Sequence, residues 1–167
     1  EYDNKIPEDL TAEEILIRSG NIGSVRIAQK IGESKMKNFL ENLGLLNKIE
    51  FDIEEVGNPI PFKWGKCKLA TASFGHGITT TPLQLTKAYS IISNGGFNIK
   101  PTLAKDHKEE NNKNRILKNG VSKKINLILR KIVSTKEGTA NLANIGGYEV
   151  GGKTGTAQKS LNGVYSK

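Results

Sequence analysis

Segments with helical periodicity and segments with strand periodicity lie far apart in this sequence and do not alternate. A chain built from βαβ units would show strands and helices in regular succession, and neither that rhythm nor an internal repeat is present. The 167 residues suffice for one compact domain with a hydrophobic core. The pattern therefore predicts an α+β fold in which helices flank an antiparallel sheet.

Two helices are expected to begin at capping boxes, in which a threonine and a Glu or Gln three residues later bond each other's backbone amides. Thr11 and Glu14 form one such pair, and Thr81 and Gln84 form the other. Pro82 suits the first turn of the second helix, where its missing N–H costs nothing. The buried face of this second helix is predicted to consist of Leu85, Ala88, Tyr89 and Ile92.

Three further helices are predicted from apolar residues at helical spacing. One begins at Asn21 after Gly20, one is expected to be capped by Ser34 and to end at Gly44, and the longest spans about residues 119–134. The residues expected to face inward are Ile22, Val25, Ala28 and Ile31 in the first, Met36, Phe39, Leu40 and Leu43 in the second, and Val121, Ile125, Leu129 and Ile132 in the third.

The intervening segments are typical of loops and short strands. Glycine and proline interrupt residues 45–70, and residues 105–115 are almost all charged or amide side chains, which indicates a solvated, mobile loop. Residues 97–103 are predicted to form a short strand or strand pair. The residues from Tyr148 onward alternate like a strand.

The stretch Gly152-Lys153-Thr154-Gly155-Thr156-Ala157-Gln158 concentrates groups that bind anions. On a strand, Lys153 and Gly155 would share one face, and Thr154 and Thr156 the other. Gly155 leaves the backbone open to the close approach of another molecule. A cation, two hydroxyls and an accessible strand edge make a candidate carboxylate site. For K-T-G taken alone, an ordinary surface strand with a solvated lysine is the alternative interpretation.

Composition and charge argue against several functional classes. The net charge is +8, but residues 1–60 carry −5 and the remainder +13. No zinc-finger spacing, RNP-like aromatic run or basic helix accompanies the basic part, so we expect no nucleic-acid partner. The single cysteine, Cys67, excludes an internal disulfide, and the two distant histidines predict neither a metal site nor a cofactor. No apolar run approaches the roughly 18 residues of a membrane span.

Further motifs precede K-T-G in a fixed order. Ser19-Gly20-Asn21 is an S-x-N motif, and Ser73-Phe74-Gly75-His76-Gly77 is followed by Thr81-Pro82-Leu83-Gln84-Leu85. K-T-G and S-x-N are two of the three signatures of penicillin-binding proteins and serine β-lactamases. From about Glu14 to Lys159 the chain resembles the transpeptidase domain of class B penicillin-binding proteins, most of all the septal, cell-division type. The resemblance implies their fold, an antiparallel sheet between helical layers.

The resemblance also implies an activity. It is that of a D,D-transpeptidase that cross-links peptidoglycan stem peptides through an acyl-serine intermediate, binds β-lactam antibiotics and uses no cofactor. Ser19 would relay a proton to the leaving amine, and Asn21 would hold the peptide amide of the substrate. Lys153 would keep the local potential positive and attract the substrate carboxylate.

The remaining K-T-G residues are implied to bind the substrate. The hydroxyls of Thr154 and Thr156 would bind the terminal carboxylate, and the N–H of Thr156 would supply one oxyanion donor. The strand edge at Gly155 would pair with the substrate backbone.

The nucleophile of the family belongs to an S-x-x-K motif upstream of S-x-N. The only S-x-x-K in this sequence runs from Ser34 to Lys37, after Ser19. Because Met36 defines the buried face and Ser34 is expected to cap the helix, Lys37 should point to solvent, and we do not interpret this pair as the nucleophile and its base. The resemblance therefore implies that residues 1–167 are part of a transpeptidase domain whose nucleophile segment lies upstream and whose final strands and helix lie downstream.

The resemblance also implies a cellular setting and leaves alternatives open. The setting is the periplasmic face of the inner membrane, through an anchor outside this chain, with other cell-division membrane proteins as partners and a role in cell shape. The alternatives are an elongation-type transpeptidase, a β-lactam sensor or β-lactamase, and a non-catalytic relative that binds a partner or an anionic glycan. Ser19 and Asn21 alone would mark an ordinary helix boundary, so their order before K-T-G carries the assignment.

Overall fold

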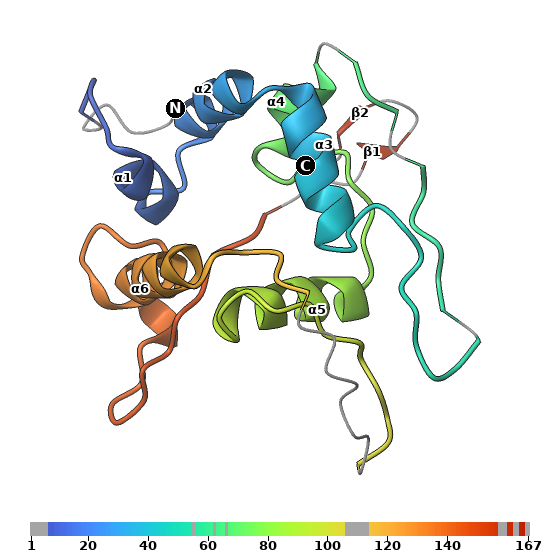
Figure 1. The fold of residues 1–167 in the computed structure, drawn as a ribbon. Coiled ribbons are helices and arrows are strands. Elements are labelled where there is room, and N and C mark those ends of the chain that lie inside the picture. Colours follow the sequence, from blue (N-terminus) through green and yellow to red (C-terminus); the bar gives the residue numbers. More distant parts are fainter. Residues whose placement is uncertain are drawn as a thin grey trace.

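Figure 1 shows a computed structural model of the chain. The structure describes residues 7–54, 56–61, 63–65, 67–105, 114–156, 160–161 and 164–165. This part of the chain is mostly helical. Its elements are α1 (Ala12–Ile17), α2 (Asn21–Ile31), α3 (Glu33–Asn42), α4 (Lys68–Ala72), α5 (Pro82–Ser93), α6 (Asn119–Ser134), the 3₁₀ turn η1 (Asn141–Ala143), β1 (Ser160–Leu161) and β2 (Val164–Tyr165).

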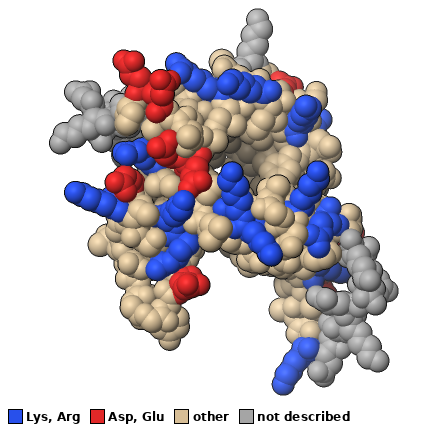
Figure 2. Space-filling view, turned by 60° about the vertical axis from the view of Figure 1, so that its left-hand side comes forward, with Lys and Arg blue, Asp and Glu red and all other residues tan. Residues whose placement is uncertain are grey.

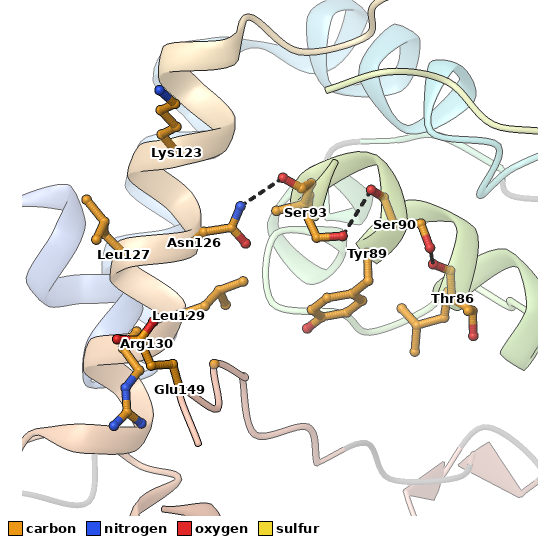
Figure 3. Close-up of a pocket in the computed structure, with 13 residues that line it drawn as sticks. Thr86, Tyr89, Ser90, Ser93, Lys123, Asn126, Leu127, Leu129, Arg130 and Glu149 are labelled. Atoms are coloured by element: carbon orange, nitrogen blue, oxygen red, sulfur yellow. Dashed lines mark hydrogen bonds between the residues drawn. The ribbon is translucent and has the colours of Figure 1, made fainter. Parts of the chain in front are cut away.

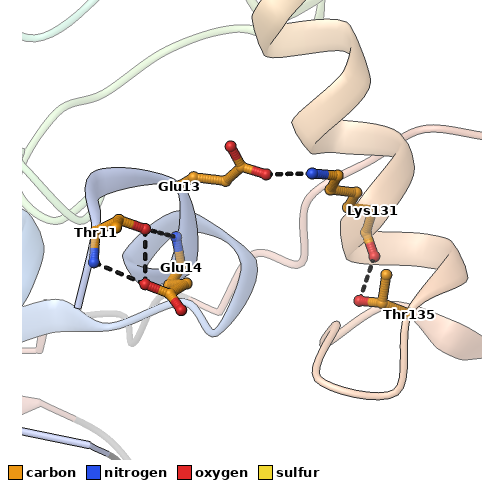
Figure 4. Close-up of polar contacts among 5 residues, drawn as sticks. All are labelled: Thr11, Glu13, Glu14, Lys131 and Thr135. Atoms are coloured by element: carbon orange, nitrogen blue, oxygen red, sulfur yellow. Dashed lines mark hydrogen bonds and ion pairs between the residues drawn. The ribbon is translucent and has the colours of Figure 1, made fainter. Parts of the chain in front are cut away.

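Both capping boxes form as predicted. The Glu14 amide donates to Thr11 Oγ1 at 3.3 Å and the Thr11 amide donates to Glu14 Oε2 at 2.8 Å (Figure 4). The bond from the Thr11 hydroxyl also lowers the pKa of the Glu14 carboxyl. At α5, the Gln84 amide donates to Thr81 Oγ1 at 3.2 Å and the Thr81 amide donates to Gln84 Oε1 at 2.8 Å. These local bonds explain why both helices begin where the sequence predicts.

The buried face of α5 differs from the prediction, because Gln84 is buried and satisfied. Its Nε2 donates to the carbonyls of Gly44 at 3.0 Å and Asn47 at 2.8 Å, which ties α5 to the chain after α3. A buried amide is tolerated when its hydrogen bonds are made. The buried residues of α5 are Gln84, Ala88 and Ile91, whereas Leu85 is 47% and Tyr89 39% exposed.

Two apolar clusters form the core. One joins α1 to α6 through Ile17, Ile128, Leu129 and Ile132, and the other contains Leu43, Ala88 and Ile91. The bounds of α6 are those predicted, but Val121 is exposed. Ser122 is buried in its place, and its hydroxyl donates to the Ile92 carbonyl. The helix therefore turns a hydrogen-bonded serine inward at its first turn.

Three local predictions need correction. The N-cap of α3 is Gly32, whose φ of 87° only glycine adopts readily, so Ser34 lies inside the first turn instead of capping it. The short helix α4 begins inside the predicted loop region of residues 45–70 and extends beyond it, and no helix was predicted there. Ile22 and Ile31, predicted to face inward, are exposed, whereas Ala28 of the same helix is buried. Ala28 faces inward as predicted.

The sheet is the largest difference from the predicted fold. Within the described residues, the paired strands are β1 and β2, an antiparallel hairpin with Ser160 opposite Tyr165, and an isolated bridge joins Phe97 to Arg115. Residues 148–156 are not assigned as a strand. A strand is assigned only where its backbone pairs with that of another strand. Here the Gly152 amide instead donates to the Leu129 carbonyl of helix α6 at 3.1 Å.

Some predictions fall on residues that the structure does not describe. Residues 106–113 of the charged loop lie outside the described part, as do Ala157, Gln158 and Lys159 after the K-T-G motif. Figure 1 shows the chain after η1 running along α6 and on toward the β1–β2 hairpin. This path brings the K-T-G motif next to α6.

Candidate active site

The centre of the candidate site is a contact between two residues 134 positions apart. Lys153 Nζ donates a hydrogen bond to Ser19 Oγ at 2.7 Å. It also donates to the carbonyl oxygen of Thr154 at 3.0 Å and to Thr154 Oγ1 at 3.2 Å. These three acceptors match the three N–H groups of an ammonium. The structure thus brings the S-x-N serine and the K-T-G lysine together, as expected for two parts of one site.

Ser19 occupies an unusual backbone position. It follows the C-cap Arg18 of α1, and its φ of 59° is the only positive value among the described non-glycine residues. The Ser19 amide donates to Leu16 O at 3.3 Å and the Gly20 amide to Ile15 O at 2.9 Å, which closes the turn between α1 and α2. A left-handed residue other than glycine costs on the order of 1–3 kcal/mol, and persists where the surrounding structure holds it.

Helix α1 is held against α6, and this contact positions Ser19. Ile17 lies two residues before Ser19 and is buried against Ile128, Leu129 and Ile132 of α6. An ion pair adds a second contact between the same helices, since Lys131 Nζ lies 2.5 Å from Glu13 Oε1 (Figure 4). Its side chains are partly exposed, so we expect the pair to contribute about 0.2–1 kcal/mol, less than the apolar contact.

Lys153 is positioned by the same turn of α6. The Gly152 amide donates to Leu129 O at 3.1 Å, and Arg130 Nη1 donates to Val150 O at 2.9 Å. At Gly151 a side chain would begin 3.3 Å from the Arg130 nitrogen, so the backbone approaches the helix closely. Leu129 therefore contacts both halves of the site, through its side chain to α1 and through its carbonyl to the K-T-G segment. Helix α6 is the common scaffold.

The electrostatic environment of Lys153 differs from that of a surface lysine. Partial burial lowers the pKa of Lys153 below its ordinary value. Within the described residues its hydrogen-bond acceptors are hydroxyl and carbonyl oxygens, not carboxylates. A lysine in such surroundings loses its proton more readily than a hydrated one, which suits a group that shares a proton with a serine hydroxyl.

The other predicted site residues lie around this contact. Asn21 is the first residue of α2, and its side chain is exposed two positions after Ser19. Thr154, Gly155 and Thr156 are exposed, and nothing lies within 4 Å of where a side chain on Gly155 would begin. The backbone at Gly155 is therefore open to another molecule, as the sequence indicates.

The predicted alternation of faces does not hold for the first two K-T-G residues. Lys153 and Thr154 were expected on opposite faces, yet Lys153 Nζ reaches the Thr154 hydroxyl. The segment is not a paired strand in the described structure, and the long lysine side chain turns back over its neighbour. Both groups therefore present polar atoms to the same place.

Sequence reasoning missed several residues that support the site. Thr139 Oγ1 lies 2.9 Å from Thr154 Oγ1, and Arg130 and Lys131 hold the flanking segments. The one signal for Thr139 is its position after Gly138, where a side chain would begin 2.1 Å from the Ile132 carbonyl oxygen. A glycine required by close backbone approach, here four residues after the end of α6, marks a constrained loop.

The Ser34–Lys37 pair lies outside this arrangement. Ser34 is exposed in the first turn of α3, and Lys37 Nζ lies 4.0 Å from Glu41 Oε1 on the same helix. The side chain of Lys37 is 50% exposed, so it points to solvent as predicted.

A separate pocket of about 870 Å³ lies between α5 and α6 (Figure 3). Tyr89 and Leu129 face it from the two helices, and Arg130 and Glu149 lie at its edge in this view. It extends to Gly151, two residues before Lys153, but neither Ser19 nor Lys153 lines it. The pocket is therefore distinct from the Ser19–Lys153 contact.

The surface charge reflects the uneven sequence. On the face drawn in Figure 2, Lys and Arg side chains are spread widely and acidic side chains gather mainly in one area. Among the described residues, no group of three His, Cys, Asp or Glu is arranged to hold a metal ion. No helix in this part of the chain is both long and apolar enough to cross a membrane.

Comparisons with known proteins place the chain among relatives of known type. The model of the penicillin-binding protein transpeptidase domain matches residues 1–167. Stage V sporulation protein D of Bacillus subtilis is 33% identical over 166 residues, which cover 91% of this chain and 25% of that protein. The probable peptidoglycan D,D-transpeptidase FtsI of Caulobacter vibrioides is 32% identical over 151 residues, covering 87% and 25%. The chain thus spans about a quarter of the length of these relatives.

Solved structures share the fold. The transpeptidase domain of penicillin-binding protein 3 from Burkholderia pseudomallei matches with a TM-score of 0.87 and 27% identity, over 95% of this chain and 49% of that one. Penicillin-binding protein 3 from Mycobacterium tuberculosis, solved with aztreonam and with ampicillin, matches with a TM-score of 0.79 and 26% identity, over 92% and 38%. With the family model covering its whole length, the chain belongs to the penicillin-binding protein transpeptidase domain family.

Proposed function

We propose that residues 1–167 are part of the transpeptidase domain of a peptidoglycan D,D-transpeptidase, and that they supply the S-x-N and K-T-G sides of its active site. The observation that carries this proposal is the 2.7 Å hydrogen bond from Lys153 to Ser19. Two motifs that the family uses for one reaction meet in space, although nothing in their sequence separation requires it.

The pair fits a proton relay during acyl transfer. When the acyl-serine forms on the nucleophile, the scissile C–N bond breaks and the leaving amine needs a proton. The Ser19 hydroxyl donates that proton and takes another from the Lys153 ammonium, to which it is already bonded. Because burial lowers the pKa of Lys153, this transfer costs less than it would from a hydrated lysine. The nucleophile itself is expected in an S-x-x-K motif upstream of Ser19.

The surrounding residues are proposed to bind the substrate. The Lys153 charge would attract the terminal carboxylate of a stem peptide, and the exposed hydroxyls of Thr154 and Thr156 would bind it. The open backbone at Gly155 allows the substrate to pair with this edge, and the Thr156 N–H would donate to the oxyanion. Asn21, two positions from Ser19, would hold the peptide amide.

The finer cellular role is also a proposal. Relatives named FtsI support a cell-division type of transpeptidase. Other membrane proteins of cell division are its proposed partners. An anchor in the inner membrane, with the domain on the periplasmic face, fits a peptidoglycan substrate. Because two structures of one related protein are complexes with aztreonam and with ampicillin, β-lactams are expected to acylate this protein as well.

Acylation mapping tests the proposed function. The full-length protein would be incubated with a fluorescent penicillin, digested, and examined by mass spectrometry. We expect one stoichiometric adduct on the serine of an S-x-x-K motif upstream of Ser19, and slower acylation in Ser19→Ala. Absence of any adduct, or an adduct on Ser34, would contradict the proposal.

A further inference from the structure

We propose that Thr139 is a further substrate-binding residue: the hydroxyl pair of Thr139 and Thr154 donates one hydrogen bond to the substrate carboxylate, in addition to that of Thr156. This inference deepens the proposed function and rests on it. It starts from the contact between Thr139 Oγ1 and Thr154 Oγ1 at 2.9 Å, in which either oxygen is able to donate.

The backbone holds Thr139 in place from both sides. The Gly138 amide donates to the Thr135 carbonyl at 3.0 Å, and the Ala140 amide donates to the Ile132 carbonyl at 3.2 Å. At Gly138 a side chain would begin 2.1 Å from the Ile132 oxygen, so only glycine fits there. The loop is therefore fastened to the end of α6, the helix that also positions Lys153. Thr139 is presented at a defined place instead of on a free loop.

The hydroxyl pair of Thr139 and Thr154 supplies a hydrogen-bond donor that Lys153 lacks. The three N–H groups of Lys153 are matched by Ser19 Oγ, the Thr154 carbonyl and Thr154 Oγ1. Without rearrangement, the ammonium has no N–H left for an arriving anion. The hydroxyls of Thr139 and Thr154 carry two protons, and their mutual bond uses one. One hydroxyl proton remains to donate outward, whichever direction the mutual bond takes.

The direction of the bond selects which threonine donates. If Thr154 donates to Thr139, the outward proton belongs to Thr139; in the opposite direction it belongs to Thr154. Thr154 Oγ1 already accepts from Lys153, and donating its own proton to Thr139 completes a chain from the cation to Thr139. Such chains polarise their hydrogen bonds in the same direction. Thr139 is then the terminal donor.

The surroundings select the ligand chemistry. Thr139 and Thr154 are both exposed, and the Lys153 ammonium lies next to them. A hydroxyl donor beside a cation favours an anionic oxygen, and charge-assisted bonds of this kind are stronger than neutral ones. The carboxylate that stem peptides and penicillins both carry has this chemistry. The competing explanation is that the hydroxyl pair only ties the Gly138–Ala140 loop to the K-T-G segment.

The test compares penicillin G, which has a free carboxylate, with its methyl ester on the full-length protein. We expect Thr139→Val to lower the second-order acylation rate with penicillin G about tenfold, the effect of losing one hydrogen bond to a charged group. Thr139→Ser should restore the rate, because it keeps the hydroxyl. The slow reaction of the ester should be the same in the wild type and Thr139→Val.

A matched control comes from α5. Thr86 is exposed, and its hydroxyl bonds the Pro82 carbonyl of its own helix at 2.8 Å, so Thr86→Val should leave both rates unchanged. If Thr139→Val does not fold, Thr139→Ala takes its place, with thermal unfolding confirming the native state.

The possible results separate the two ideas. Equal slowing with penicillin G and its ester would show that Thr139 only ties the loop, and would overturn the inference while leaving the proposed function intact. Unchanged rates in Thr139→Val would overturn it as well. A wild-type protein that penicillin G does not acylate would contradict the proposed function, and this inference with it.

Discussion

Two serine–lysine pairs in this molecule differ in whether their side chains contact each other. Ser34 and Lys37 are three positions apart on α3 and match a catalytic spacing, yet both are exposed and Lys37 lies 4.0 Å from Glu41. Ser19 and Lys153 are 134 positions apart, yet they form a 2.7 Å hydrogen bond. Partial burial lowers the pKa of Lys153.

The difference lies in the surroundings of each pair: Ser34 and Lys37 lie on α3, whereas Ser19 and Lys153 lie in segments that pack against α6. None of the residues of α3 is buried, whereas α6 buries five and contacts both α1 and the K-T-G segment. A side chain on a solvated helix keeps its hydration, so a motif there lacks the environment that changes its chemistry. Proximity in sequence is therefore a weaker indication of a reactive pair than packing of both segments against the same core-forming helix.

The largest expected effect is that of Lys153→Ala. Removing this cation takes away both the proton donor to Ser19 and the charge that attracts the carboxylate. We expect acylation of the full-length protein by penicillin to slow by about 10²–10³, as for other single electrostatic groups of an active site. Stopped-flow acylation measures this. Lys37→Ala is the matched control and should react at the wild-type rate. Equal acylation rates in the two variants would show that Lys153 has no greater role in acylation than Lys37.

The pH dependence should follow the lowered pKa of Lys153. As pH rises through that pKa, the ammonium loses its charge, so acylation should decline at lower pH than an ordinary lysine would dictate. The sign for stability is opposite: burial penalises the charged form, so the folded state is destabilised below the folded pKa. That penalty disappears as pH rises past the unfolded value.

Rate measurements from neutral to strongly alkaline pH check this expectation. Lys153→Arg provides the comparison, because a guanidinium keeps its charge throughout the range. Its residual activity should lack the alkaline decline. A decline of the same shape in both proteins would assign the titration to another group.

A smaller effect distinguishes the two core clusters. Ile17→Ala and Leu43→Ala each remove a buried aliphatic side chain, one in the α1–α6 cluster and one in the cluster of α5. Each should lower the free energy of unfolding by about 2–5 kcal/mol, measured in urea. Only Ile17→Ala should also slow acylation at a temperature where both variants are folded, because Ile17 anchors the turn that holds Ser19. Equal acylation by both variants would show that this anchoring is unimportant.

The smallest expected effect is that of Ser34→Ala, which should change neither stability nor acylation. Ser34 does not cap α3, and the side chain of Lys37 is directed to solvent. Intact-mass measurement of residues 1–167 after incubation with penicillin should likewise show no adduct on Ser34. A stoichiometric adduct there would reverse the assignment of the two pairs.

Much of the local structure could be predicted from short-range rules. The capping boxes at Thr11 and Thr81 and the bounds of α6 agree with the structure, because each depends on hydrogen bonds or periodicity within a few residues. The buried face of α5 could not be predicted in this way. Gln84 is buried because it meets two carbonyls about 40 positions away, which no local pattern reveals.

The residues of the candidate site likewise fall into those that short motifs identify and those that only spatial contacts identify. The motifs identify Ser19, Lys153 and Thr154 from the sequence, whereas Thr139 emerges only from its 2.9 Å contact with Thr154. Its residue type and spacing match no motif. The positive φ of Ser19 was equally invisible, since serine has no intrinsic preference for that region.

Because capping and periodicity act over a single turn, the residues alone indicate where α1 and α5 begin and which side chains are available for chemistry. The meeting of Ser19 and Lys153 is a product of tertiary packing. Their contact depends on the burial of Ile17 against α6 and on the bond from Gly152 to the Leu129 carbonyl of the same helix. The hydrophobic effect that drives this packing has no directional preference, so the geometry exists only once both segments are docked on one helix.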